Sequence, residues 1–198
     1  MRHPDLAQQI INLQTADQQL RDRLARSGQL GQGYNEAMQR LHNQNATRLA
    51  HIIDDIGYPT VERVGEAANA AAWLVIQHAI GQPAFMRKCL QLLEEAVAEQ
   101  QADPKHLAYL SDRIAVLAGQ PQRYGTQFDW DEQGKLSPNT CDDRAAVDRR
   151  RAKLGLNSLA EQTRLMRKRA AEEQQQAPAD FDARKREMDD WRKRVGWE

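Results

Sequence analysis

Apolar residues recur three and four positions apart over most of this chain, and this spacing places them on one face of a helix. Leu6, Ile10 and Leu13 open the series. Glycine and proline divide it, because glycine favours helix ends and proline cannot continue a helix. We therefore predict helices over residues 4–27, 35–56, 66–80, 83–97 and 104–119. The third stretch is apolar nearly all round, which indicates a central, buried helix.

Residues 122–130 break this pattern, because their side chains alternate at period two. The alternating residues are Tyr124, Thr126, Phe128 and Trp130. A turn-forming segment, 131–134, follows, so the pattern predicts one β-hairpin. In such a strand Tyr124 and Thr126 would point one way, and Arg123 and Gln127 the other.

Helical patterns return after the hairpin: a short helix ends at Gly155, Ser158 caps the next one, and a last amphipathic helix spans residues 180–195. The predicted fold class is mainly α, a compact multi-helix domain with one short β-hairpin and a helical C-terminal extension. We expect a core domain over residues 1–157 and a charged extension over residues 158–198.

The zero net charge of the chain hides an uneven distribution. Up to Asp143 there are 13 Lys and Arg against 18 Asp and Glu, and from Arg144 onward there are 15 against 10. A basic tail can bind nucleic acid or lipid headgroups. Acidic residues are interspersed through it, so docking on the body or exposure to solvent is favoured, and nucleic acid is an unlikely partner.

The residue content of the chain predicts a soluble protein. There is no signal peptide, and no segment approaches the roughly 20 apolar residues that a membrane helix needs. The chain is therefore expected in the cytoplasm, without a membrane partner. Cys89 and Cys141 lack metal-ligand spacing.

One acid lies on an apolar face. Asp17 stands between Leu13 and Leu20 on the stripe of the first helix. Burying an unpaired carboxylate costs several kcal/mol, so Asp17 needs a partner. Arg21, one turn later, could pair with it, and a structural ion pair and a ligand site are equally open.

Two histidines also interrupt apolar faces. His42 lies beside Asn45 in the second helix, and Gln77-His78 ends the third. Histidine is the side chain most readily used for acid–base chemistry near neutral pH. A histidine satisfied in the core is the alternative for His42, and a helix cap is the alternative for His78.

Polar groups gather in the fifth helix and the segment after it. Tyr109, Asp112 and Arg113 lie among apolar residues, where a surface ion pair is the alternative. The segment 122–127 is rich in hydrogen-bond donors, and its glycine allows backbone to approach a ligand.

A fold could satisfy these scattered polar groups by bringing them into one pocket. The predicted catalytic residues are His42, His78 and Asp112. The predicted substrate-binding residues are Asp17, Arg21, Asn45, Gln77, Tyr109, Arg113, Gln122, Tyr124, Thr126 and Gln127.

No known catalytic template fits the sequence, which lacks GxSxG, HExxH, P-loop and GxGxxG motifs. The glycine-rich connector 28–33 follows a helix and lacks the Lys-Ser/Thr of a phosphate loop. A metal held by His42, His78 and a carboxylate is geometrically possible, but we expect no metal and no cofactor.

These residues resemble a bacterial family of proteins known only as a domain of unknown function, DUF6624. The resemblance covers roughly residues 5 to 160. It rests on Asp17-Gln18 with Arg21, Met38-x-x-x-His42-x-x-Asn45, Gly57-Tyr-Pro59, Ala72-Trp73 to Gln77-His78, Tyr109-Leu-x-Asp-Arg113, and most specifically Gln122-x-Tyr-Gly-Thr-Gln127. It implies that these polar residues are signature positions of the family.

The leading functional hypothesis is an enzyme that uses histidine acid–base chemistry on a small polar or anionic substrate, by hydrolysis, elimination or group transfer. The alternative is a non-catalytic binding or interaction module, such as an immunity or antitoxin-like protein or a ligand sensor. In such a module the polar residues would form an exposed surface patch. The oligomeric state is left open.

Overall fold

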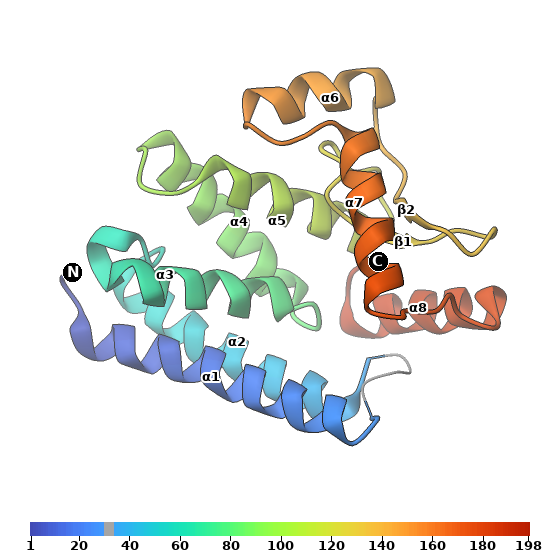
Figure 1. The fold of residues 1–198 in the computed structure, drawn as a ribbon. Helices are drawn as coiled ribbons and strands as arrows, with labels where there is room; N and C mark the ends of the chain where they lie inside the picture. The colour runs from blue at the N-terminus through green and yellow to red at the C-terminus, as the bar shows by residue number, and fades with distance from the viewer. Residues whose placement is uncertain (30–33) are drawn as a thin grey trace. The chain divides into compact units, whose positions relative to one another are not determined.

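A computed structural model describes residues 1–29 and 34–198, and the chain divides into two compact units, Met1–Asp103 and Pro104–Glu198. The described residues form eight helices and one two-stranded antiparallel hairpin, which confirms the predicted fold class (Figure 1). Residues 30–33 of the glycine-rich connector lie outside the described residues. The predicted boundary at 157/158 falls inside the second unit and stays a prediction.

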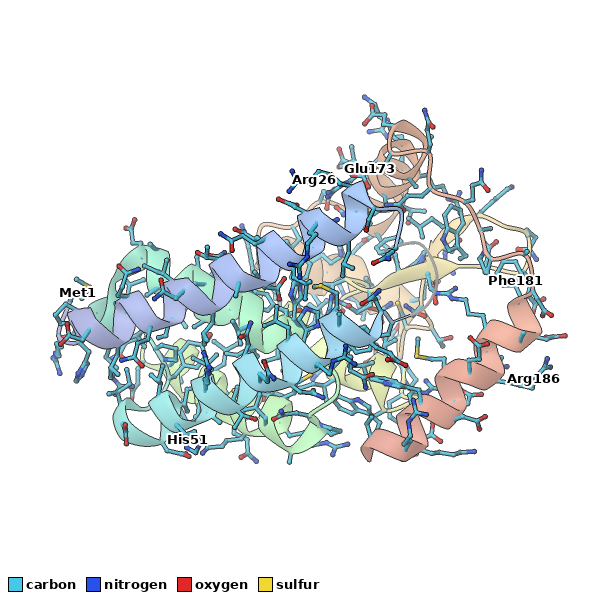
Figure 2. All side chains as sticks on the ribbon, turned by 90° about the horizontal axis from the view of Figure 1, so that it is seen from below. Met1, Arg26, His51, Glu173, Phe181 and Arg186 are labelled. Atoms are coloured by element: carbon cyan, nitrogen blue, oxygen red, sulfur yellow. The ribbon has the colours of Figure 1, made fainter. Side chains whose placement is uncertain are left out.

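The first unit contains α1 (Pro4–Arg26), α2 (Glu36–Ile56), α3 (Val61–His78) and α4 (Pro83–Ala98). Local signals set their ends. Pro4 lies in the first turn of α1, and the Asn35 side chain caps α2 by accepting hydrogen bonds from the backbone N–H groups of Ala37 and Met38. Figure 2 shows α1 running from near Met1 to Arg26.

The packing centre of the first unit is α3, which contacts α1, α2 and α4. Ala68, Ala71 and Ala72 are almost completely buried, and their small side chains allow the neighbouring helices to approach closely. Ala70 is exposed, so the helix is not buried on every side. It begins one turn earlier than predicted, and Gly65, with φ of 82°, interrupts it.

The second unit contains α5 (Pro104–Leu117), the strands β1 (Phe128–Trp130) and β2 (Leu136–Pro138), then α6 (Arg144–Lys153), α7 (Leu159–Glu172) and α8 (Phe181–Val195). The hairpin pairs Phe128 with Pro138 and Trp130 with Leu136. Asp131 organises its turn by accepting hydrogen bonds from the backbone of residues 133 and 135 and from the Ser137 hydroxyl.

The first strand of the hairpin is shorter than predicted. Residues 123–127 form a loop before β1, so the predicted alternation of Tyr124 and Thr126 against Arg123 and Gln127 is wrong. The N–H groups of this loop bond to a side chain instead of a neighbouring strand, and Gly125 adopts a φ of 64°.

Two features of α7 and α8 hold the C-terminal part of the second unit together. Arg167 of α7 donates a hydrogen bond of 2.8 Å from Nε to the Leu136 carbonyl of β2. Trp191 and Trp197, at the end of α8, are buried. No helix in the described part of the chain is long and apolar enough to cross a membrane.

Gly125 and Gly155 offer a matched pair for testing the loop. Both have a φ of 64°, but a Cβ on Gly125 would lie 2.6 Å from Leu159 Cδ1, whereas nothing lies within 4 Å of one on Gly155. We expect Gly155→Ala to lower the free energy of unfolding by about 1–2 kcal/mol through backbone strain. Gly125→Ala should cost roughly 1 kcal/mol more, because the buried Leu159 must also move. Urea unfolding measures both, and equal losses would contradict this account.

Candidate functional site

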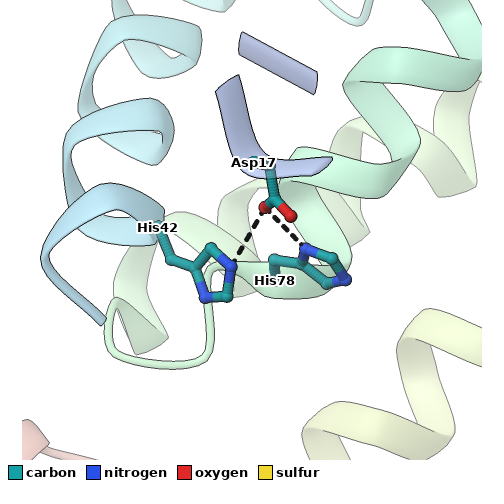
Figure 3. A group of neighbouring side chains, drawn as sticks. All are labelled: Asp17, His42 and His78. Carbon is teal, nitrogen blue, oxygen red and sulfur yellow. Dashed lines mark hydrogen bonds and ion pairs between the residues drawn. The ribbon is translucent and has the colours of Figure 1, made fainter. Parts of the chain in front are cut away.

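The first unit contains a cluster of three side chains, Asp17, His42 and His78, which come from α1, α2 and α3 (Figure 3). One carboxylate oxygen, Asp17 Oδ2, lies 2.8 Å from His78 Nδ1 and 3.0 Å from His42 Nε2. The His78 contact is a hydrogen bond. The two imidazole rings lie close together, with centroids 4.8 Å apart.

Helix periodicity, and a close approach of the turn after α3 to α2, bring these three side chains together. Asp17 is one turn after Leu13 on the buried face of α1, and His42 is one turn after Met38 on that of α2. His78 is the last residue of α3. Just beyond it, a Cβ on Gly81 would lie 2.7 Å from Asn43 Oδ1, so glycine permits the turn after α3 to approach α2 closely.

The three side chains of the cluster differ in solvent exposure. The side chains of Asp17 and His42 are 2% and 9% exposed, whereas that of His78 is 30% exposed. Figure 3 draws the second ring nitrogen of His78 on the side away from Asp17. His78 is therefore the member of the cluster that solvent or a ligand reaches.

Asp17 is held in its charged form. Its burial acts to raise the pKa, but the interactions with His42 and His78 outweigh burial and hold the pKa of Asp17 well below its usual range. An ionised carboxylate fixes the orientation of both imidazoles and favours positive charge, from a proton or a cation, in their neighbourhood.

Tyr34 extends the cluster on the far side of His42. Its hydroxyl oxygen lies 2.6 Å from His42 Nδ1, and the two rings stack with centroids 5.7 Å apart. Burial and the nearby charge of Asp17 raise the pKa of Tyr34, so the phenol stays protonated. Both ring nitrogens of His42 thus face a side chain of the first unit. Nothing in the residue pattern marks Tyr34 beyond its place next to the cap, Asn35.

The other predicted site residues of the first unit lie near this cluster in sequence but act differently. Asn45 is buried and donates a hydrogen bond of 3.0 Å to the Leu13 carbonyl, which ties α2 to α1. Gln77 is buried beside His78 in the chain. Arg21 is exposed, and among the described residues the ion pairs of Asp17 are with the two histidines and not with Arg21.

The second unit contains a different polar centre, built on Asp112 of α5. This carboxylate is fully buried and accepts five hydrogen bonds from the loop before β1. The donors are the backbone N–H groups of Arg123, Tyr124 (to both oxygens) and Thr126, and the Thr126 hydroxyl, at 2.8–3.1 Å. Asp112 therefore shapes the loop.

Two glutamines complete the same loop. The Gln122 side chain donates to the Gln127 and Asn139 carbonyls at 3.0 and 2.8 Å, and its Oε1 accepts from the Gln127 N–H at 2.9 Å. Gln127 donates to the Thr126 hydroxyl at 3.0 Å. The donor-rich segment predicted to bind substrate thus uses many of its polar groups internally.

A family model described as a family of unknown function, DUF6624, matches residues 4–172. The chain belongs to this family. The resemblance inferred from the sequence is confirmed. No curated protein and no solved structure matches the chain.

The DUF6624 match includes every helix and strand from α1 to α7, and therefore both polar centres. The α8 helix lies beyond it. The Asp17 and Asp112 centres belong to different units, and a single pocket that joins them stays a prediction, as do the predicted roles of Tyr109 and Arg113 on α5.

Sequence reasoning also missed Arg151, a buried arginine of α6 that donates hydrogen bonds to the loop 123–127. It donates to the Tyr124 carbonyl at 2.8 Å, and to the Asn157 backbone and side-chain oxygens at 2.6 and 2.8 Å. Arg151 is one of the basic residues that the sequence analysis counts in the tail from Arg144 onward. Its distance of one turn from the buried Val147 was the available sign.

A groove of about 510 Å³ lies on the first unit between α1 and α2. Its lining includes Asn45, Arg48 and His51 but none of the three cluster residues. We give more weight to the cluster than to the groove, because only the cluster combines buried charge with titratable groups.

Asp112→Asn tests the loop-shaping role. The asparagine amide has an NH2 group where the aspartate has an acceptor oxygen, so this group would face the N–H donors of the loop. Two or more buried N–H groups would then lack an acceptor, and we expect the free energy of unfolding to fall by about 2–4 kcal/mol. The exposed Asp182 of α8 is the control, and Asp182→Asn should change the free energy of unfolding by less than about 0.5 kcal/mol. Urea unfolding measures both values, and similar losses for the two variants would refute the assignment.

Proposed function

We propose that this member of DUF6624 is an enzyme that performs acid–base chemistry on a small polar or anionic molecule at the Asp17–His42–His78 cluster. The observation that carries the proposal is the hydrogen bond of 2.8 Å between His78 Nδ1 and the buried Asp17, with the second ring nitrogen of the partly exposed His78 on the side away from Asp17. Hydrolysis, elimination and group transfer are all compatible with it.

In this proposal the residues of the cluster have different roles. A buried carboxylate that accepts the Nδ1–H of an imidazole leaves Nε2 as the basic nitrogen, which is the arrangement of general bases in many hydrolases. His78, the most exposed member, exchanges the proton with the substrate. Asp17 fixes its tautomer and stabilises the imidazolium that forms.

His42 takes a positioning role in this proposal. Its two nitrogens face Asp17 and Tyr34, and its side chain is 9% exposed. It contacts the same Asp17 oxygen as His78 does. The predicted catalytic role is thereby divided, with the proton transfer at His78 and its support at His42. Asp112 supports the loop of the second unit rather than the reacting atoms.

The burial of the cluster favours an enzyme over the alternative of an interaction module. An interaction module would display these groups on an exposed patch, whereas Asp17 is 1% exposed. Ion pairs of the basic tail, such as Arg169 with Glu173 of the tail and Arg184 with Asp129 of β1, support a tail whose charge is neutralised within the chain rather than by nucleic acid. We assign the enzyme to the bacterial cytoplasm on the composition of the chain.

A thermal-shift screen of polar metabolites tests the proposal, with mass spectrometry of each hit to detect conversion. We expect at least one compound to raise the Tm of the wild-type protein and to be converted. His78→Gln should abolish both effects while leaving the fold intact, because His78 lies at a helix end and is partly exposed. His51→Gln is the matched control, since His51 is an exposed histidine of α2 (Figure 2).

The proposal is wrong if the His78→Gln variant binds and converts the same compounds as the wild-type protein. It is also wrong if the screen yields no ligand whose effect depends on His78.

A further inference from the structure

We infer that Asp17, His42 and His78 bind a divalent transition-metal ion, and that zinc is the ion their donor atoms fit best. The inference rests on the proposed function, because it assigns a cofactor to the same cluster. It deepens that function by changing which group supplies the base.

The donor atoms are close enough to share one ion. Asp17 Oδ2, His42 Nε2 and His78 Nδ1 all lie within 4.8 Å of one another, and two of the separations are 2.8 and 3.0 Å. Zinc bound tetrahedrally at about 2.0–2.2 Å needs ligand atoms roughly 3.3–3.5 Å apart. To meet that requirement, the two contacts of Asp17 Oδ2 must open by about half an ångström or less, and the separation of the two histidine nitrogens, which is at most 4.8 Å, must come to the same range. Side-chain rotation can supply shifts of this size.

One donor atom of the cluster is in an ion-pair contact but makes no hydrogen bond. His42 Nε2 is buried and lies 3.0 Å from Asp17 Oδ2, but it makes no contact with hydrogen-bond geometry to any described residue. Buried polar atoms that make no hydrogen bond are rare in native structures, and a bound ion is one accepted reason for them. An ion between this nitrogen and the carboxylate would satisfy both atoms.

Tyr34 supports the tautomer that metal binding requires. A histidine that binds a metal through Nε2 carries its proton on Nδ1 and usually donates it to a second group. His42 Nδ1 lies 2.6 Å from the Tyr34 hydroxyl oxygen, which can accept that proton. Tyr34 is thus a positioning residue for the His42 ligand.

The donor set selects the kind of ion. Two imidazole nitrogens and one carboxylate oxygen suit zinc and its first-row neighbours, whereas magnesium and calcium prefer oxygen ligands throughout. Three protein ligands leave a fourth position, which is typical of catalytic rather than structural zinc. The ligands come from three helices, which explains why the sequence contains no metal motif.

A bound ion would act as a Lewis acid and lower the pKa of a water molecule at the open position. The base of the proposed reaction would then be that water after it has released a proton to solvent, and His78 would be a ligand. Without an ion, the base is His78 itself. These two versions of the reaction are distinguishable, because only the version that uses a metal-bound water depends on metal.

Isothermal titration of the chelator-treated, full-length chain with zinc chloride tests the inference. We expect one ion per chain with a Kd below about 1 µM. Asp17→Asn, His42→Gln and His78→Gln should each weaken binding by roughly 100-fold or more, and Tyr34→Phe by roughly 10-fold. His51→Gln should bind as the wild type does. Titration with cobalt should give the visible absorption of a four-coordinate ion.

The inference is overturned if the wild-type chain binds no stoichiometric zinc, or if zinc binding survives unchanged in the His78→Gln variant. Circular dichroism checks each variant. If Asp17→Asn does not fold, His78→Gln decides alone, because its side chain is the most exposed of the three.

The outcomes separate this inference from the proposed function. Stoichiometric zinc binding with no His78-dependent metabolite hit would support the metal site and refute the enzyme. His78-dependent conversion by chelator-treated protein that binds no zinc would support the enzyme and refute the metal site.

Discussion

The structure of the first unit depends on the burial of one negative charge. Leaving the Asp17 carboxylate in the core without partners would cost several kcal/mol. Imidazoles from α2 and α3 remove that cost, and because both contact the same oxygen, they fix the position of α1 relative to both helices. A sliding of any one helix by a turn would separate the charge from its partners. The cluster is therefore a packing constraint, and we propose that it is also a chemical centre.

The second buried carboxylate, Asp112, meets the same constraint in a different way. Its partners are four neutral backbone and hydroxyl donors of one loop rather than titratable side chains. Such donors do not take up or release protons near neutral pH, so this arrangement specifies the loop shape and little else. The partners of Asp17 are imidazoles, which as a side-chain type can exchange protons near neutral pH and can bind metals. The difference between the two acids lies in their partners, not in their burial.

Much of the fold could be predicted from the sequence, because its signals are local. Pro4, Asn35 and Ser158 mark helix starts, and the structure has helices that begin within one residue of each. The alternating pattern predicts a strand over 122–130 that is longer than the observed β1. The reason is a non-local acceptor, Asp112, which takes N–H groups that the pattern would assign to hydrogen bonds between strands. Likewise, periodicity identified Asp17 as buried but suggested only a local partner, Arg21. Its actual partners come from α2 and α3, and periodicity within one helix says nothing of which faces meet.

The same reasoning explains why the two histidines could not be ranked from the sequence. Each interrupts an apolar face, and each contacts the same carboxylate oxygen. They differ in what surrounds the other ring nitrogen: for His42 it is the Tyr34 hydroxyl, and for His78 it is the more exposed edge of the cluster. Because both rings share Asp17, a positive charge gained by one reduces the attraction that remains for the other. The buried histidine thus influences the exposed one through the carboxylate, without having to meet a substrate itself.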